Sequence, residues 1–198
     1  RGHFYLGPVV WAPSGSPPPR LPARRPLAYV TMGSTGDTRV LPDILRAALA
    51  AGLDILASGV DDRQASALEE QVSGLGEHWA HGRGFDPSPV LGRAALTICH
   101  GGSGTVYQSL QHGVPVLCLP DNPDQGMVTA NLGQAGAGVV LAPEYATPTR
   151  LAGAIGVAAG CAAGARRLGA VLKMWDTRVR WLAWLGAFAE PKGTAASK

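Results

Sequence analysis

Short, continuous apolar runs alternate along the chain with longer segments in which apolar residues recur every three or four positions. A continuous run is typical of a strand buried on both faces of a sheet, and the longer spacing is typical of a helix. The runs predict strands at residues 27–32, 53–57, 96–99, 115–119 and 138–141. The helical spacing predicts helices that end near residue 51, cover residues 103–112 and 124–135, and begin near residue 148. One helix and one short strand are expected within residues 61–84.

This alternation predicts an α/β domain over residues 27–160. Strands and helices joined by short loops favour a Rossmann-like, doubly wound and mostly parallel sheet with right-handed crossovers. Residues 1–26 are expected to be an extended interdomain linker, because the prolines from Pro13 onward remove backbone donors and stiffen the chain. A linker at this place implies a preceding domain, so the chain is expected to be part of a longer protein.

Residues 161–198 are expected to form a C-terminal helix and tail. Apolar side chains recur at helical spacing over residues 165–189, with basic residues between them, and three of the aromatic residues are Trp175, Trp181 and Trp184. Two interpretations follow from this pattern. The helix packs its apolar stripe on the domain, or it lies as a basic, Trp-rich helix at the surface of an anionic membrane.

Composition narrows the class of protein. Hydrophobic residues make up 46% of the 198 residues and charged residues 16%, which favours a folded core over disorder. The net charge is +3, but the basic residues gather near the two ends and no basic run is interleaved with aromatics on a predicted sheet, which argues against nucleic-acid binding. Cys99, Cys118 and Cys161 lack metal-site spacing, and the first two lie in apolar runs. With no signal peptide and no apolar run of membrane-spanning length, a cytoplasmic location is expected.

The segment with the clearest chemistry follows the predicted strand at residues 96–99. There the chain continues as His100-Gly101-Gly102-Ser103-Gly104-Thr105, and a helix begins. The first N–H groups of a helix lack internal partners and carry partial positive charge, glycines let a diphosphate approach closely, and hydroxyls add donors. His100 follows the strand at the edge where ligands bind in open α/β sheets, where it can donate to a phosphate oxygen. The structural alternative is a tight turn with a buried histidine.

A carboxylate and an amide follow the next predicted strand. The chain runs Gly113-Val114-Pro115 through the strand to Asp121-Asn122-Pro123-Asp124-Gln125, so that this loop lies on the same edge of the sheet as the glycine loop. Asp124 and Gln125 offer neighbouring acceptors and donors, which suits the hydroxyls of a sugar. Their structural alternative is the capping of the following helix.

Together these motifs resemble a known family. The order His-Gly-Gly-x-Gly-Thr, Gly-Val-Pro, Pro and Asp-Gln is similar to the donor site of UDP-glycosyltransferase-like enzymes of the GT-B fold. The similarity is greatest to bacterial enzymes that glycosylate macrolides and other natural products, and it covers about residues 4–155. The resemblance implies a hexosyltransferase that uses a UDP- or dTDP-sugar and a small-molecule acceptor hydroxyl. It also implies direct displacement at the anomeric carbon without a bound metal or cofactor.

The resemblance assigns a role to individual residues of this chain. His100 and the loop of Gly101, Gly102, Ser103, Gly104 and Thr105 would hold the donor diphosphate, with Ser34 and Thr35 touching phosphate from the first loop. Asp124 and Gln125 would bind the transferred sugar, and Phe85 would lie beside the base. Ser88 and Pro89 replace the glutamine that usually follows the proline near the base, and Val128 and Thr129 stand where an asparagine is common.

The family's general base is a histidine of the N-terminal, acceptor-binding domain, so no catalytic residue is expected in this chain. His78 and His81 are expected to lie in a loop. Two alternatives stay open: a nucleotide-sugar epimerase, for which Asp121 and Asp124 are the candidate carboxylates, and a non-catalytic nucleotide-sugar or membrane interaction module. The expected partners are a nucleotide sugar, the N-terminal domain and, at the C-terminal helix, a peripheral membrane contact.

Overall fold

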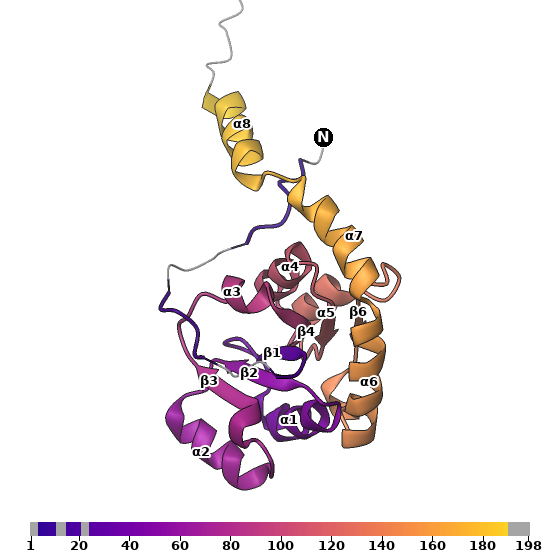
Figure 1. Cartoon of the computed structure of the whole chain (residues 1–198). Coiled ribbons are helices and arrows are strands. Elements are labelled where there is room, and N and C mark those ends of the chain that lie inside the picture. Colours follow the sequence, from indigo (N-terminus) through magenta and orange to yellow (C-terminus); the bar gives the residue numbers. More distant parts are fainter. Residues whose placement is uncertain (1–3, 11–14, 21–23, 190–198) are drawn as a thin grey trace, which may run out of the picture.

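The computed structural model describes residues 4–10, 15–20 and 24–189, and within these ranges the chain forms one parallel sheet with helices on both faces (Figure 1). The strand order is β3-β2-β1-β4-β5-β6, and every neighbouring pair is parallel. The strands are β1 (Leu27–Thr31), β2 (Asp54–Ser58), β3 (Trp79–Gly82), β4 (Ala94–Cys99), β5 (Val116–Cys118) and β6 (Gly138–Val140). This is the order of a dinucleotide-binding doubly wound sheet, so the predicted fold class is confirmed.

The helices divide between the two faces of the sheet. The bounds are α1 (Leu41–Ala50), α2 (Asp62–Gln71), α3 (Ser88–Leu91), α4 (Ser103–Gln111), α5 (Pro123–Thr129), α6 (Pro148–Gly160), α7 (Ala162–Lys173) and α8 (Thr177–Ala189). Short 3-10 turns are η1 (Thr38–Val40), η2 (Gly76–His78) and η3 (Pro143–Tyr145). Helices α1, α2 and α6 cover one face, and α4, α7 and the short α3 lie on the other.

Alternate side chains of each strand therefore enter different hydrophobic clusters. In β1, Ala28 and Val30 pack under α1 and α6, whereas Leu27 and Tyr29 face α3. In β5, Leu117 packs on the face covered by α1 and α6, whereas Val116 and Cys118 belong to the cluster under α4 and α7. Because both faces are buried, the strands show the continuous apolar runs from which they were predicted.

Three predictions for local structure were wrong. The helix expected over residues 124–135 ends at Thr129, and turns follow it. The single helix expected over residues 165–189 is broken into α7 and α8, because Asp176 accepts a hydrogen bond from the backbone N–H of Val179 and starts a new helix. His81 lies in β3 beside Trp79, with the ring centroids 5.2 Å apart, and His78 ends a 3-10 turn.

The described parts of the predicted linker pack against the domain. Ser16 forms an isolated parallel bridge with Phe85, and the backbone N–H of Asp86 donates to the Ser16 carbonyl over 3.3 Å. The carbonyl of Pro8 accepts from the Thr177 hydroxyl at 2.8 Å, next to the start of α8. Residues 1–3, 11–14 and 21–23 of that linker lie outside the described residues.

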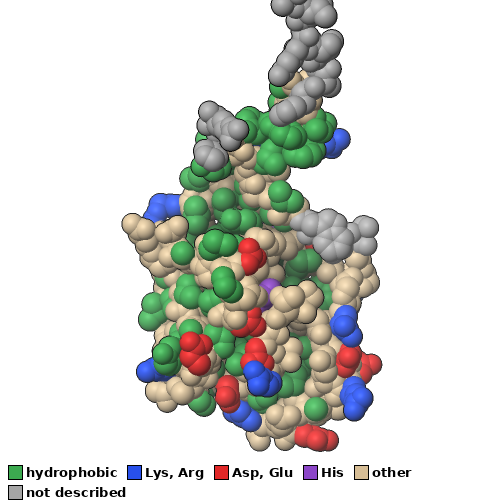
Figure 2. Space-filling view, turned by 180° about the vertical axis from the view of Figure 1, so that it is seen from behind, with side chains coloured by type: hydrophobic (Ala, Val, Ile, Leu, Met, Phe, Trp, Pro, Cys, Tyr) green, Lys and Arg blue, Asp and Glu red, His purple; other side chains and the backbone are tan. Residues whose placement is uncertain are grey.

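Helix α8 projects away from the domain, whereas α7 lies along it (Figure 1). Hydrophobic side chains gather over α8 and the adjoining chain in Figure 2, and most charged side chains lie on the opposite, lower part. Trp181, Leu182 and Leu185 are all exposed, so the expected packing of the whole C-terminal segment on the domain holds for α7 only. No single described helix is long and apolar enough to cross a membrane; α6 and residues 162–187 pass that length and composition test only as a pair bent by 59°.

Candidate functional site

The sheet reverses its direction of winding between β1 and β4, and the loops that follow these two strands meet there. Ligands of open α/β sheets bind at this switch point, outside the carboxyl ends of the strands. The loop after β1 runs through Gly33 to Asp37, and the loop after β4 contains His100, Gly101 and Gly102. The loop after β5, with Asp121, joins the same edge. The fold therefore brings together the three loops that the sequence singled out.

The second of these loops leads directly into α4. Gly101 has φ +90°, a conformation that L side chains rarely adopt, and Gly102 occupies the N-cap position of the helix. No side chain within the described ranges caps α4, so its first N–H groups are free donors at the positive end of the helix dipole. Ser103 and Gly104 are exposed at this helix start. The combination suits an anion.

His100 is enclosed by glycines from both loops. Its side chain is buried, with 7% of the residue exposed. A Cβ atom placed on Gly33 would lie 2.9 Å from the Nε2 atom of His100, one on Gly102 would lie 2.6 Å from that atom, and one on Gly36 would lie 2.7 Å from the His100 Cβ. These distances are below ordinary contact. Glycine is therefore required at positions 33 and 102 to make room for the imidazole, and at position 36 to make room for the Met32 carbonyl oxygen and the His100 Cβ atom, whereas a Cβ on Gly104 would meet nothing within 4 Å.

The imidazole has an unpaired nitrogen inside the protein. Its Nδ1 atom is buried without a hydrogen bond in the described part of the chain. Burial lowers the pKa of His100, and the nearby Asp121 carboxylate and a hydrogen bond with the backbone of Thr31 oppose that shift by smaller amounts. The ring is therefore neutral at pH 7, with one nitrogen able to donate and the other to accept.

Asp121 connects the loop after β5 by hydrogen bonds to the loop after β1 and to helix α5. One carboxylate oxygen of Asp121 accepts from the backbone N–H of Asp37 at 3.1 Å, and its own backbone N–H donates to the Gln125 side-chain oxygen at 2.9 Å. Asn122 caps α5 by accepting from the Gln125 backbone N–H at 3.1 Å. The capping role considered for Asp124 therefore belongs to Asn122. Asp121 was weighed in the sequence only as an epimerase carboxylate, and its position directly before the Asn-Pro helix start was the available signal.

The remaining predicted residues lie in different settings. Gln125 is buried, and its side-chain nitrogen has no partner, whereas Asp124 is exposed on the first turn of α5. Ser34 and Thr35 are exposed in the loop after β1, and Thr105 is half-buried in the first turn of α4. Phe85 is buried against the sheet with Tyr29 and other apolar residues, so its ring is part of the core near the end of β3.

Metal-ligating side chains do not gather in this part of the protein. Within the described ranges, no three His, Cys, Asp or Glu residues lie close enough to hold a metal ion. Asp37 instead forms an ion pair with Arg39, at 2.9 Å, and this pairing lowers the pKa of the Asp37 carboxyl. The donors of the site are accordingly backbone N–H groups, hydroxyls, the Gln125 amide and the imidazole.

Comparison with known proteins gives a consistent picture. Residues 86–170 match the family described as "Erythromycin biosynthesis protein CIII-like, C-terminal domain". The PGL/p-HBAD biosynthesis rhamnosyltransferase of Mycobacterium bovis (strain BCG / Pasteur 1173P2) is 34% identical over 158 residues, which are 77% of this chain and 33% of that protein. The demethyllactenocin mycarosyltransferase of Streptomyces fradiae is 29% identical over 137 residues, covering 65% of this chain and 28% of that one.

Solved structures share the fold. The spinosyn rhamnosyltransferase SpnG superposes with a TM-score of 0.77 at 23% identity, over 94% of this chain and 52% of that chain. The calicheamicin glycosyltransferase CalG4 gives 0.73 at 20% identity, over 96% and 48%. The chain spans about a third of the length of the mycobacterial relatives that it matches. These matches confirm the resemblance inferred from the glycine motif.

Proposed function

Because residues 86–170 belong to the family of C-terminal domains like that of erythromycin biosynthesis protein CIII, we propose that this chain is the donor-binding part of a glycosyltransferase. It binds a UDP- or dTDP-sugar, and the complete enzyme transfers the hexose to a hydroxyl of a small-molecule acceptor. One observation carries the proposal: a buried histidine whose Nδ1 atom has no hydrogen bond lies beside the uncapped start of α4 at the switch point of the sheet.

In this proposal the donor diphosphate lies over the start of α4. The free N–H groups and the hydroxyls of Ser103 and Thr105 bind its oxygens, and Ser34 and Thr35 reach it from the loop after β1. The Nε2 atom is the ring atom of His100 nearest to the Cβ position of Gly102, so a neutral ring with its proton on Nε2 donates to a phosphate oxygen. These groups stabilise the charge of the departing diphosphate, and no cofactor is required in this proposal.

The transferred sugar and the base are assigned to the flanking elements. Asp124 and Gln125 bind sugar hydroxyls, and the unpartnered amide nitrogen of Gln125 supports this role, since a buried donor without a partner is costly. Phe85 lies at the base side of the site through the segment that joins β3 to α3. The general base and the acceptor cleft lie in an N-terminal domain, so this chain alone binds donor but does not turn it over.

Calorimetric titration with UDP, dTDP and ADP tests the proposal. We expect a pyrimidine diphosphate to bind, and His100→Ala to weaken it by about 1–3 kcal/mol through loss of a charge-assisted hydrogen bond. His112→Ala is the matched control, because His112 is exposed at the other end of α4. Binding that is equal for all three nucleotides and insensitive to His100→Ala would count against the donor site.

A second variant separates binding from folding. Gly104 has open space around its Cβ position at the helix start, so Gly104→Ala should raise the stability by about 0.5–1 kcal/mol while its methyl group obstructs the diphosphate. We expect nucleotide affinity to fall about tenfold. Gly153→Ala, in the open surface of α6, is the control: it should stabilise similarly and leave affinity unchanged. Undiminished nucleotide binding by Gly104→Ala would place the phosphates elsewhere.

We also assign the exposed surface of α8 to the rest of the enzyme. Trp181, Leu182 and Leu185 are unburied, and the mycobacterial relatives are about three times as long as the matched region. Burial of these side chains by the acceptor-binding domain is preferred over a peripheral contact with an anionic membrane, and the complete enzyme is assigned to the cytoplasm. Co-sedimentation with anionic liposomes tests this choice: binding that is lost on charge reversal of Arg178 would favour the membrane.

A further inference from the structure

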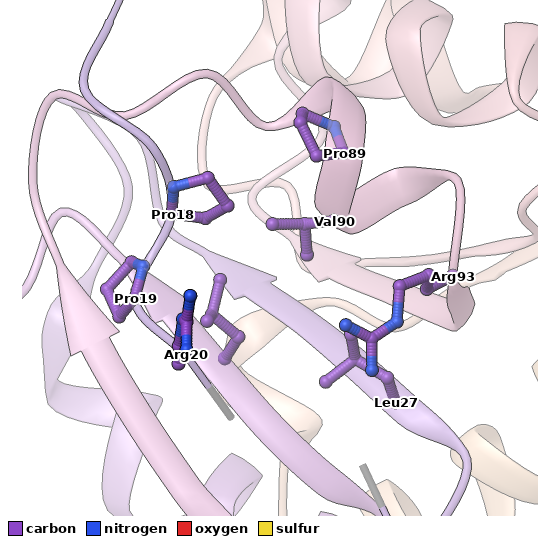
Figure 3. A pocket seen from close by; sticks show the side chains of 8 residues that line it. Pro18, Pro19, Arg20, Leu27, Pro89, Val90 and Arg93 are labelled. Atoms are coloured by element: carbon purple, nitrogen blue, oxygen red, sulfur yellow. The ribbon is translucent and has the colours of Figure 1, made fainter. Parts of the chain in front are cut away.

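A cavity of about 390 Å³ lies on the face of the sheet that α3 covers. On this face Leu27 of β1 and Leu56 of β2 pack against the four-residue helix α3, and residues 18–20 lie at the same cavity. Leu56 lines the cavity together with Leu27, Val90 and three prolines. Figure 3 shows Leu27, Val90, Pro18, Pro19 and Pro89 around it. Leu27 is four residues from Thr31, or about 13 Å along the strand, so this end of the cavity lies away from the edge at which His100 lies. Pro19, at the other end, packs against Gly82 at the end of β3.

Two arginines complete the lining without any acidic residue. Figure 3 places the guanidinium of Arg93 beside Leu27 and that of Arg20 beside Pro19, on the other side of the cavity. Neither guanidinium has an ion pair or a hydrogen bond within the described residues, whereas Arg24, close in sequence, pairs with Glu77 at 3.5 Å. The guanidiniums of Arg20 and Arg93 thus line one cavity, and no acidic side chain among its lining residues neutralises them.

The rest of the lining offers little else to a polar ligand. Pro18, Pro19 and Pro89 have no backbone N–H to donate, and the other walls are aliphatic. Recognition of a polar group therefore falls to the two guanidiniums, whose planar donor forks match a carboxylate in a bidentate manner. The volume is at the small end of the range of ligand pockets, which fits a short aliphatic or single-ring compound.

We propose that this cavity binds a small amphipathic carboxylate, with its apolar body against Leu27, Leu56 and Val90 and its acid group between Arg20 and Arg93. None of the residues of the His100 loop lines this cavity, although Phe85 packs in the same apolar cluster as Leu27, Leu56 and Val90. The cavity contacts α3 through Pro89 and Val90, and α3 directly follows the segment of Phe85 and Asp86.

Octanoate is the probe, and octanamide, which has the same length without the charge, is its matched control. Titration of the isotope-labelled chain by NMR should give saturable shifts at Leu56, Val90 and Arg93. We expect octanamide to bind about tenfold more weakly than octanoate, since charge-assisted hydrogen bonds are lost. The double variant Arg20→Ala, Arg93→Ala should weaken octanoate by about tenfold or more, by the same reasoning.

A control double variant also removes two arginine charges, but at positions away from the cavity. Arg63→Ala combined with Arg167→Ala changes two exposed arginines of α2 and α7 and should leave octanoate binding unchanged. Both double variants alter surface side chains, so the fold is retained. Three results would overturn the proposal: equal affinity for octanoate and octanamide, no effect of the Arg20 and Arg93 substitutions, or shifts confined to the surface around Trp175 and Trp181.

Discussion

The carboxylate of Asp121 accepts a hydrogen bond from the backbone N–H of Asp37, which joins the loop after β5 to the loop after β1 across 3.1 Å. The same carboxylate raises the pKa of His100, which lies between these loops, against the larger effect of burial. One side chain therefore fixes the distance between two loops and adjusts the charge of the ring between them. These two effects can be separated experimentally.

Asp121→Asn should remove the charge and leave an oxygen that can accept from Asp37. The pKa of His100 is expected to fall further below its usual range, because the opposing carboxylate is gone. Titration of the imidazole C–H signals by NMR measures this shift. Asp121→Ala removes the acceptor as well, and should additionally broaden or move the amide signals of residues 33–37.

Asp124→Asn is the control for this titration. Asp124 lies in the neighbouring turn and is exposed, as Asp121 is, but it is not among the groups that shift the His100 pKa. Its substitution should leave the imidazole titration unchanged. A pKa of His100 that stays constant in Asp121→Asn would mean that the carboxylate is screened by solvent.

Gly33→Ala should destabilise the protein through the His100 ring. Gly33 has φ +59°, and an added Cβ would collide with the imidazole, so we expect a loss of about 2–4 kcal/mol from strain and overpacking together. Gly52→Ala has a similar backbone conformation, φ +72°, and open space around its Cβ. It should cost only the backbone strain, about 1–2 kcal/mol.

A double-mutant cycle tests whether the cost of Gly33→Ala comes from contact between the added Cβ and the His100 ring. In a His100→Ala background, Gly33→Ala should cost no more than Gly52→Ala does, because the ring is absent. Urea unfolding of the four proteins gives the coupling free energy. An additive result would show that the loop, rather than the ring, sets the requirement for glycine at position 33.

Much of this site could be predicted from sequence, because most of its residues lie in short segments whose own residue types determine the local backbone. The glycine run, the strand before it and the turn after β5 lie in short segments whose residue types limit the backbone directly, as Gly101 at φ +90° illustrates. The hydrogen bond between Asp121 and Asp37 could not be predicted, because the two residues are 84 positions apart in the sequence. The sequence also could not assign Gly33 and Gly102 to the imidazole, because that contact exists only after β1 and β4 have paired.

Asp54→Ala should destabilise the fold at the opposite end of the sheet. Asp54 is fully buried at the start of β2; it accepts from the backbone N–H groups of Arg24 and Arg25, each at 3.0 Å, and lies 2.9 Å from the His78 Nδ1 atom. Loss of the carboxylate leaves these donors unpaired, at a cost of about 1–3 kcal/mol. Thermal or urea unfolding at pH 7 measures the loss.

The pH dependence of the wild type and the variant gives a further check. Burial alone would raise the pKa of Asp54, but hydrogen bonds from His78 and from the two arginine amides outweigh it, and the pKa is lowered. A carboxyl with a lowered folded pKa contributes stability above its unfolded pKa, and that stability is lost as the pH falls through the folded value. The difference between wild type and Asp54→Ala should therefore shrink below about pH 4.

Gly169→Ala should separate α7 from α4. An added Cβ at Gly169 would strike the carbonyl oxygen of Leu110, at the end of α4, and backbone cannot yield as a side chain can. We expect a loss of about 1–3 kcal/mol from overpacking, despite the better helix propensity of alanine. Gly153→Ala, with open space in α6, should stabilise by about 0.5–1 kcal/mol. Differential scanning calorimetry compares them, and similar melting temperatures would mean that α7 shifts freely.

The break between α7 and α8 marks where apolar periodicity misled the prediction. Leu168 and Leu172 continue in register toward Trp175, so the spacing alone favours one helix. Asp176 followed by Thr177 is a helix-start signal, and the structure uses it. Tertiary contacts then fix the direction of α8. The Arg180 Nε atom donates to the Tyr5 carbonyl at 2.8 Å, and the Arg180 Cζ atom lies 4.5 Å from the centroid of the Trp175 ring.

The enclosure of one imidazole by glycines from two loops limits how relatives of this protein can be recombined. Gly33 of one loop and Gly102 of the other both lie against the ring, with no room for a Cβ atom at either position, so each loop has to match the same imidazole. A chimaera whose crossover falls between β1 and β4 would combine loops of different parentage around His100. Crossovers placed before β1 or after α4 keep the pair intact, and those hybrids should yield more soluble, well-folded product.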